Sequence, residues 1–203
     1  MMEYDDLINS GILELYAAGL ADEHESLRVE QALAESDRVR QEYGEVCFAL
    51  EQLARSQAIA PHATVKPALM AAIDYIERIQ RGEEPGNPPM LHERSVVRDY
   101  QPWLERADMV LPEKGDDIYA RIIGRSEVGT MAILWIRTEA PTEVHYHEHE
   151  SFLIVEGTCD IYVGEKVFSL VPGDYMKIPL HIPHHVKVTS ATPCKAILQR
   201  MAA

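Results

Sequence analysis

The spacing of apolar residues changes partway along this chain, and the change limits the folds available to it. Between residues 5 and 81, apolar residues recur every three or four positions, as they do on one face of a helix. From residue 109 onward, short runs rich in β-branched and aromatic residues alternate with turns. The sequence therefore predicts two parts: a helical bundle, and then an antiparallel β structure of sandwich or barrel type.

Four helices are expected in the first part, and three of them have recognisable capping residues at their starts. Asp22, with Glu25 three positions later, forms a capping-box pattern before the second helix. Ser36 precedes a third helix, expected at residues 37–56, and Thr64 precedes the fourth.

A breaker segment, RGEEPGNPP at residues 81–89, separates the two parts. Its glycines, prolines and charges cannot continue a helix or a central strand. We therefore predict a helical domain over residues 1–84, a linker over residues 85–108 and a β-barrel domain over residues 109–203.

The charge and the cysteines exclude several classes of protein. With 33 acidic and 19 basic residues, the chain has a formal net charge of −14, so direct binding to nucleic acid is not expected. The three cysteines are too scattered for a disulfide framework. We expect no membrane span and a cytoplasmic location, because no long apolar run is present and acids stand where a signal peptide has Lys or Arg.

Histidines gather in the β part: six of the nine fall between residues 145 and 185. In a strand, alternate side chains share a face, so His145 and His147 are expected to converge on one point. Glu150 follows closely, and a turn before His184 can return that histidine from a neighbouring strand. We predict these four residues as metal ligands. The competing interpretation is that HYHEHE is a solvated strand end that binds nothing.

The order of these residues resembles the cupin family, whose first motif has HxH, Glu, and then Gly seven positions on, and whose second motif has PxGxxH. The matching residues in this chain are His145, His147, Glu150 and Gly157, and then Pro179, His181 and His184. The resemblance implies an antiparallel double-sheet β-barrel, a jelly roll, with one divalent metal per chain. Zinc is the first expectation, and iron, manganese or nickel are the alternatives.

The chain departs from the cupin pattern in two places. Only two residues separate His147 from Glu150, where three or four are usual, and His181 replaces the second-motif glycine. His149, His181 and Tyr146 are therefore kept as alternative ligands or as residues that support a ligand. No catalytic residue is assigned.

Residues 8–75 resemble the N-terminal domain of bacterial anti-sigma factors, in which a Tyr-Ala-x-Gly turn precedes an acidic helix and a longer third helix. Zinc-binding members have a HxxxCxxC set where this chain has Ala32, Ser36 and Val39, so no zinc is expected there. Residues 1–84 hold 17 acidic and 7 basic residues, a charge that complements a basic sigma factor.

The two resemblances together imply a cupin-containing anti-sigma factor. In such a transcriptional regulator, the helices bind a sigma factor while the cupin metal site senses a small molecule or an oxidant. One alternative is a metal-dependent cupin enzyme, a dioxygenase or isomerase, with a helical dimerisation module that would make it a homodimer. Another is a protein that binds a sugar or a small acid without catalysis.

Overall fold

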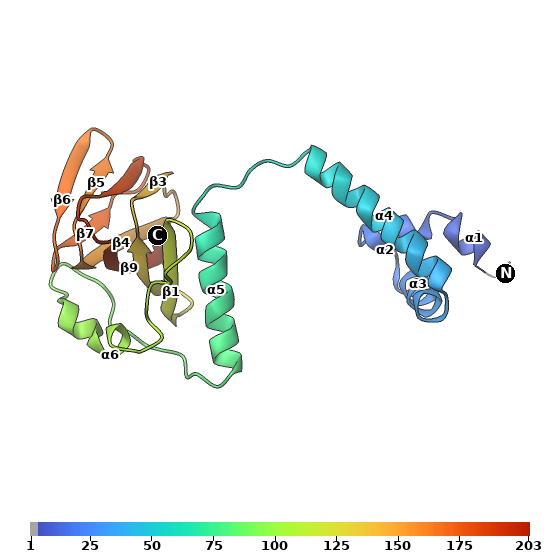
Figure 1. Ribbon diagram of the computed structural model, residues 1–203, viewed down its shortest axis with the longest axis horizontal. Helices are drawn as coiled ribbons and strands as arrows, with labels where there is room; N and C mark the ends of the chain where they lie inside the picture. The colour runs from blue at the N-terminus through green and yellow to red at the C-terminus, as the bar shows by residue number, and fades with distance from the viewer. Residues whose placement is uncertain (1–3) are drawn as a thin grey trace. The chain divides into compact units, whose positions relative to one another are not determined.

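The computed structural model describes residues 4–203 of a chain that divides into two compact units, meeting at Ala60 and Pro61 (Figure 1). The sequence predicts an end to the helical domain at residue 84, whereas the structure places the last of the four predicted helices in the second unit. The predicted fold class is confirmed, because helices precede two antiparallel sheets. No helix in the described part of the chain is both long and apolar enough to cross a membrane.

The first unit is a small helical bundle. Its helices are α1 (Asp5–Ile8), α2 (Ile12–Ala17), α3 (Glu23–Glu35) and α4 (Asp37–Ser56). The first predicted helix is split in two, because Gly11 adopts a left-handed φ of 81° between α1 and α2. The predicted capping box is present: the Asp22 carboxylate accepts from Glu25 N at 2.8 Å, and Glu25 Oε2 accepts from Asp22 N at 2.9 Å.

The second unit contains nine strands, all within its described residues. These are β1 (Ile118–Arg125), β2 (Gly129–Ile136), β3 (Glu139–Glu143), β4 (Glu148–Glu156), β5 (Cys159–Val163), β6 (Lys166–Leu170), β7 (Tyr175–Ile178), β8 (His184–Val188) and β9 (Cys194–Ala202). One sheet has the order β1-β2-β9-β4-β7 and the other β3-β8-β5-β6, and every pairing is antiparallel.

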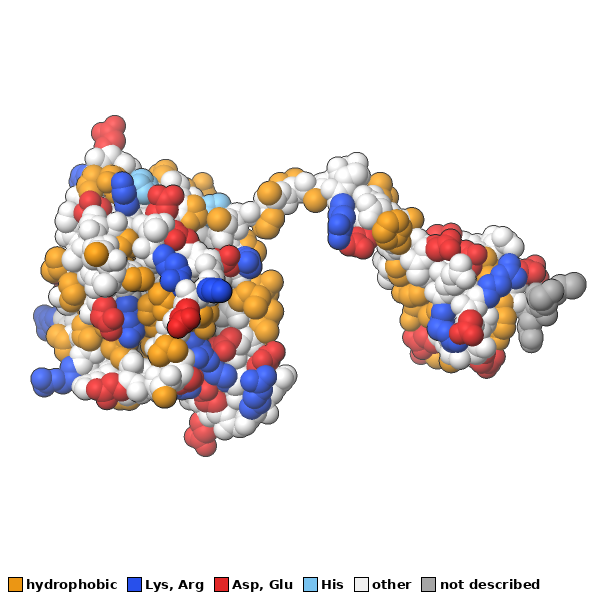
Figure 2. All heavy atoms as spheres, viewed as in Figure 1, with side chains coloured by type: hydrophobic (Ala, Val, Ile, Leu, Met, Phe, Trp, Pro, Cys, Tyr) orange, Lys and Arg blue, Asp and Glu red, His pale blue; other side chains and the backbone are white. Residues whose placement is uncertain are grey.

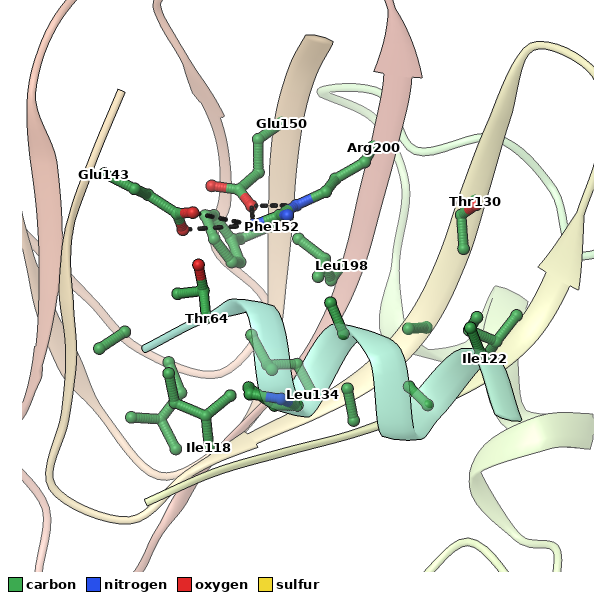
Figure 3. A pocket seen from close by; sticks show the side chains of 18 of the residues that line it. Thr64, Ile118, Ile122, Thr130, Leu134, Glu143, Glu150, Phe152, Leu198 and Arg200 are labelled. Carbon is green, nitrogen blue, oxygen red and sulfur yellow. Dashed lines mark hydrogen bonds and ion pairs between the residues drawn. The ribbon is translucent and has the colours of Figure 1, made fainter. Parts of the chain in front are cut away.

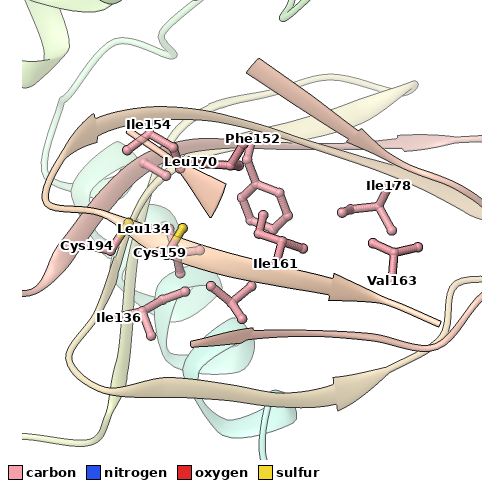
Figure 4. Packing of buried hydrophobic residues seen from close by; sticks show 12 residues of the cluster. Leu134, Ile136, Phe152, Ile154, Cys159, Ile161, Val163, Leu170, Ile178 and Cys194 are labelled. Carbon is pink, nitrogen blue, oxygen red and sulfur yellow. The ribbon is translucent and has the colours of Figure 1, made fainter. Parts of the chain in front are cut away.

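The two sheets form a jelly-roll sandwich. The predicted barrel is not closed, since no hydrogen-bonded ladder joins the sheets within the described residues. Alternation along each strand sends one set of side chains between the sheets, where Phe152, Ile161 and both strand-end cysteines, Cys159 and Cys194, pack together (Figure 4). This inner core supports the strands that carry the functional side chains.

The predicted linker, residues 85–108, packs against the outer face of the five-stranded sheet. Within it lie a 3₁₀ turn, η1 (Val97–Tyr100), and a short helix, α6 (Gln101–Leu104). Leu91 and Tyr100 are buried there against the outward side chains of β2. Gly86 has to lack a side chain, because a Cβ atom would lie 2.1 Å from the carbonyl oxygen of Ile123.

The helix α5 (Val65–Gln80) lies against β1 in the second unit. Buried Arg78 holds it there by donating to the carbonyl oxygen of Ile122 at 2.5 Å, and Asp74 of the helix pairs with Arg121 on β1 at 3.0 Å. Before the helix, His62 Nε2 lies 3.0 Å from the carbonyl oxygen of Thr142 on β3. The start and the end of α5 are therefore both tied to the sandwich.

Candidate metal centre

Four side chains that suit a metal ion converge between the two sheets. They are Glu143 at the end of β3, His145 just after it, Glu150 on β4 and His184 at the start of β8. One ligand atom from each lies within 4.8 Å of the others. Because β3 and β8 belong to one sheet and β4 to the other, both sheets contribute to the cluster.

Glu150 is the centre of the cluster. Its Oε2 atom lies 3.0 Å from His184 Nε2 and 3.2 Å from His145 Nε2. Glu143 Oε1 is 3.9 Å from the same His184 nitrogen. The Glu150 side chain is 1% exposed and that of His184 is 2% exposed, so water cannot replace these contacts.

Arg200 on β9 lies beside both carboxylates (Figure 3). Its Nε atom donates to Glu150 Oε1 at 2.8 Å, and its Nη2 atom donates to Glu143 Oε1 at 3.2 Å. Glu150 therefore has one oxygen toward the guanidinium and the other toward the histidines.

The electrostatics of the site favour ionised carboxylates. Burial raises the pKa of Glu150, but the contacts with His145 and His184 and the charge of Arg200 outweigh it and hold the pKa well below its usual range. The contact with Glu150 raises the pKa of His145, against the opposite effect of burial. A buried carboxylate that stays ionised can bind a metal cation.

The residues fit a divalent metal. His145 Nε2 is buried and makes no well-directed hydrogen bond, although Glu150 Oε2 is close to it. A buried imidazole nitrogen without a hydrogen-bond partner is unfavourable unless a cation or a ligand satisfies it. Two imidazole nitrogens and two carboxylate oxygens are donors that first-row divalent metals accept.

Three of the four residues predicted as ligands lie in this cluster, and His147 does not. His147 lies in an exposed bend between β3 and β4, where the two-residue alternation of a strand does not hold. Its carbonyl oxygen accepts a hydrogen bond from Ala203 N at 3.0 Å. Glu143 offers the fourth potential ligand atom of the cluster.

The alternative ligands lie around the cluster and do not join it. Tyr146 is 59% exposed, and its ring centroid lies 5.6 Å from that of His181. His181 has a left-handed φ of 63° and donates its backbone N–H to the carbonyl of His145 at 2.8 Å. His149 directly precedes Glu150 on β4, and so points to the opposite face of the strand. Only His181 therefore supports a ligand, and it does so through its backbone.

Motif spacing could have identified Glu143. If four residues separate the second position of HxH from the glutamate, that position becomes His145 and the first becomes Glu143. This alignment places the first motif two residues earlier than the predicted one, which followed the histidine-rich stretch. The strand that carries Glu143 also gave no signal, because EAPTE contains a proline and two acids, which strands disfavour.

The second unit is therefore a small jelly-roll sandwich with a buried His/Glu cluster between its two sheets. Residues 131–199 match the Cupin domain family. No curated protein matches the chain.

Three similar solved structures each overlap less than half of this chain. The Cnp3 cupin domain of Schizosaccharomyces pombe shares 13% identity with a TM-score of 0.42, over 44% of this chain and 67% of that one. A predicted oxalate decarboxylase from Thermotoga maritima shares 14% identity with a TM-score of 0.43, over 48% and 97% of the two chains. A protein from Thermus thermophilus shares 19% identity with a TM-score of 0.44, over 48% and 95%.

Proposed function

We propose that this chain is an anti-sigma type regulator, in which the cupin unit senses a small molecule or an oxidant through a bound metal. The observation that carries the sensor is the buried convergence of Glu143, His145, Glu150 and His184. These four residues would hold a first-row divalent metal. Such a metal supplies positive charge and a coordination position that a signal molecule can occupy.

Support for a protein partner comes from α4 in the first unit. Of its residues only Val39 is buried, while Phe48 is 62% exposed and Leu53 is 60% exposed. On the neighbouring helix α3, Leu27 is 61% exposed. Large apolar side chains left exposed on adjacent helices are typical of an interaction surface.

The charge of the same unit indicates the kind of partner. Residues 1–60 contain 13 acidic and 4 basic residues. A partner with a basic rim around an apolar groove complements this surface, and sigma factors have basic surfaces where they face DNA. The sigma factor is therefore our proposed partner.

Coupling between the two functions is proposed to run through α5. This helix follows the junction at Ala60 and Pro61, and His62 contacts Thr142, the residue before Glu143. A signal that moves Glu143 would thus change the contact between Thr142 and His62, which fixes the chain just after the junction. Coupling requires only that the signal molecule bind with different affinity to the form of the chain that holds the sigma factor and to the form that does not.

The test first asks whether a neighbouring gene encodes a sigma factor, and then measures binding of the full chain to that protein. We expect the Phe48→Ser/Leu53→Ser variant to bind at least about tenfold more weakly than the unchanged chain. Gln52→Ser on the same helix is the matched control and should bind normally. Equal binding by all three proteins, or no binding by any, contradicts the proposed partner.

A metal-dependent enzyme, a dioxygenase or isomerase, is the second candidate. It is favoured by a cavity of about 300 Å³ that Glu143 and Glu150 line. Metal-dependent oxygen uptake or product formation with a small substrate, abolished by His184→Ala, would support this candidate over the regulator.

A further inference from the structure

The cavity beside the metal cluster lies between α5 and the inner face of the five-stranded sheet (Figure 3). Its volume is about 300 Å³, at the small end of the range for ligand-binding pockets. The strands line it with aliphatic and aromatic side chains, among them Ile118, Ile122, Leu134, Phe152 and Leu198. Such a wall suits an apolar ligand body.

The sequence of α5 keeps this space open. Its cavity side presents Pro67, Ala68, Ala71 and Ala72. Tyr75 and Ile79, nearer the end of the helix, pack toward the sheet. Four other large apolar residues are left at the surface, where Figure 2 shows hydrophobic side chains: Leu69, Met70, Ile73 and Ile76 are 41% to 57% exposed. A helix that served only to cover the sheet would bury its large side chains, because filling a core stabilises it.

A polar row crosses the sheet at one side of the cavity. Cross-strand pairing aligns Arg125 with Thr130, Thr130 with Arg200, and Arg200 with Glu150. All four residues line the cavity, and directly paired residues share one face of a sheet. The row places two cations on a wall that also carries the carboxylates of Glu143, Glu148 and Glu150.

The two arginines differ in what they already bind. Arg200 donates to Glu143 and Glu150. Arg125 forms no ion pair and no side-chain hydrogen bond with any residue from Tyr4 to Ala203. Its guanidinium is therefore available to an anion, and the hydroxyl of neighbouring Thr130 can add a hydrogen bond.

We propose that this cavity binds a monocarboxylate with a short aliphatic tail. The carboxylate pairs with Arg125 and Thr130, and the tail lies beneath the small residues of α5. The proposal rests on the proposed function, because it names the class of molecule that the cupin unit senses. It also explains how a signal would act on α5, since the ligand lies directly against that helix.

The test measures binding of octanoate, octan-1-ol and octylammonium to the full metal-loaded chain by calorimetry. We expect octanoate to bind at least about tenfold more tightly than octan-1-ol, and octylammonium not to bind. Arg125→Gln should remove the preference for the acid while leaving the alcohol affinity unchanged. Octan-1-ol binding as tightly as octanoate to the unchanged chain would overturn the carboxylate assignment.

The location is tested by filling the cavity. Ala72→Leu, and Ala68→Leu as a milder change near the helix start, should each weaken octanoate at least about tenfold. Ala191→Leu, in an exposed loop outside the cavity, should bind octanoate normally. Equal octanoate binding by all three variants would overturn the location.

Metal content and sigma-factor binding are measured on the same samples. If these are normal and octanoate does not bind, the ligand class is overturned while the proposed function stands. If metal and sigma factor do not bind but octanoate does, the proposed function fails while the cavity assignment is supported.

Discussion

Arg200 and Glu150 face each other across β9 and β4, and Arg200 Nε donates to Glu150 Oε1 at 2.8 Å. This pair leaves the second carboxylate oxygen, Oε2, directed at His145 and His184. Arg200 therefore has two effects on the site: it orients a ligand atom, and it neutralises part of the negative charge that would attract a metal.

Replacing this arginine should separate those two effects. In Arg200→Gln the metal-free protein loses the partner of the buried Glu150 and the partly buried Glu143, which should cost about 3 kcal/mol of unfolding free energy. Added metal then replaces the missing positive charge, so the stabilisation by metal should exceed that of the unchanged chain. Thermal unfolding with and without metal measures both quantities. A variant that gains less from metal than the unchanged chain would show that Arg200 mainly positions the ligands.

The ligand set can be decided by two substitutions. Glu143→Ala should weaken metal binding by more than the roughly 10- to 100-fold that loss of an outer hydrogen-bonding partner costs, because a donor atom is removed. His147→Ala should leave the affinity unchanged, since that side chain is exposed in the bend. Metal titration of both variants is the measurement. The reverse order of effects would restore His147 as a ligand.

The attachment of α5 should depend on pH through Glu83. Hydrogen bonds from Arg106 lower the pKa of Glu83 from 4.5 to about 2, and Arg78 assists against the effect of burial. A lowered folded-state pKa stabilises the protein above pH 4.5, and this contribution is lost as the pH falls toward 2. Glu83→Gln should therefore cost about 3 kcal/mol at neutral pH and progressively less in acid. Exposed Glu84→Gln is the control, and a cost for Glu83→Gln that is independent of pH would contradict the assignment.

The first unit should depend on its capping box. Asp22→Ala leaves the N–H of Glu25 without its side-chain acceptor and should destabilise α3 by about 1 kcal/mol. Urea unfolding followed by helical circular dichroism reports this loss. His24→Ala, an exposed change one position into the helix, should unfold at the same urea concentration as the unchanged chain.

Local patterns in the sequence were sufficient for most of the fold. The expected range 37–56 for α4 matches the structure, and the run IYARIIGR is β1. In both segments the apolar period and the flanking cap or turn residues agree with the tertiary structure. The division at Ala60 could not be read in this way, because the helical period of α5 is the same whether it packs on other helices or on a sheet.

The site was less accessible to sequence reasoning because it depends on contacts between distant strands. His145, Glu150 and His184 were identifiable from residue type and spacing. Arg200 had no motif, and only the register of β4 against β9 places it beside Glu150. The cavity was equally hidden, since the alanines of α5 gain meaning only when a sheet lies opposite them.

The metal cluster takes side chains from both sheets, so a bound ion would act as a cross-link between them. It would join β3 and β8 to β4 at one end of the sandwich. Cys159 on β5 and Cys194 on β9 pack together at the other end. Chelation should therefore speed amide hydrogen exchange in β3 and at the start of β8 first, while the amides near the two cysteines keep their protection. The sandwich would open from one end, as two sheets that separate where the ion had joined them.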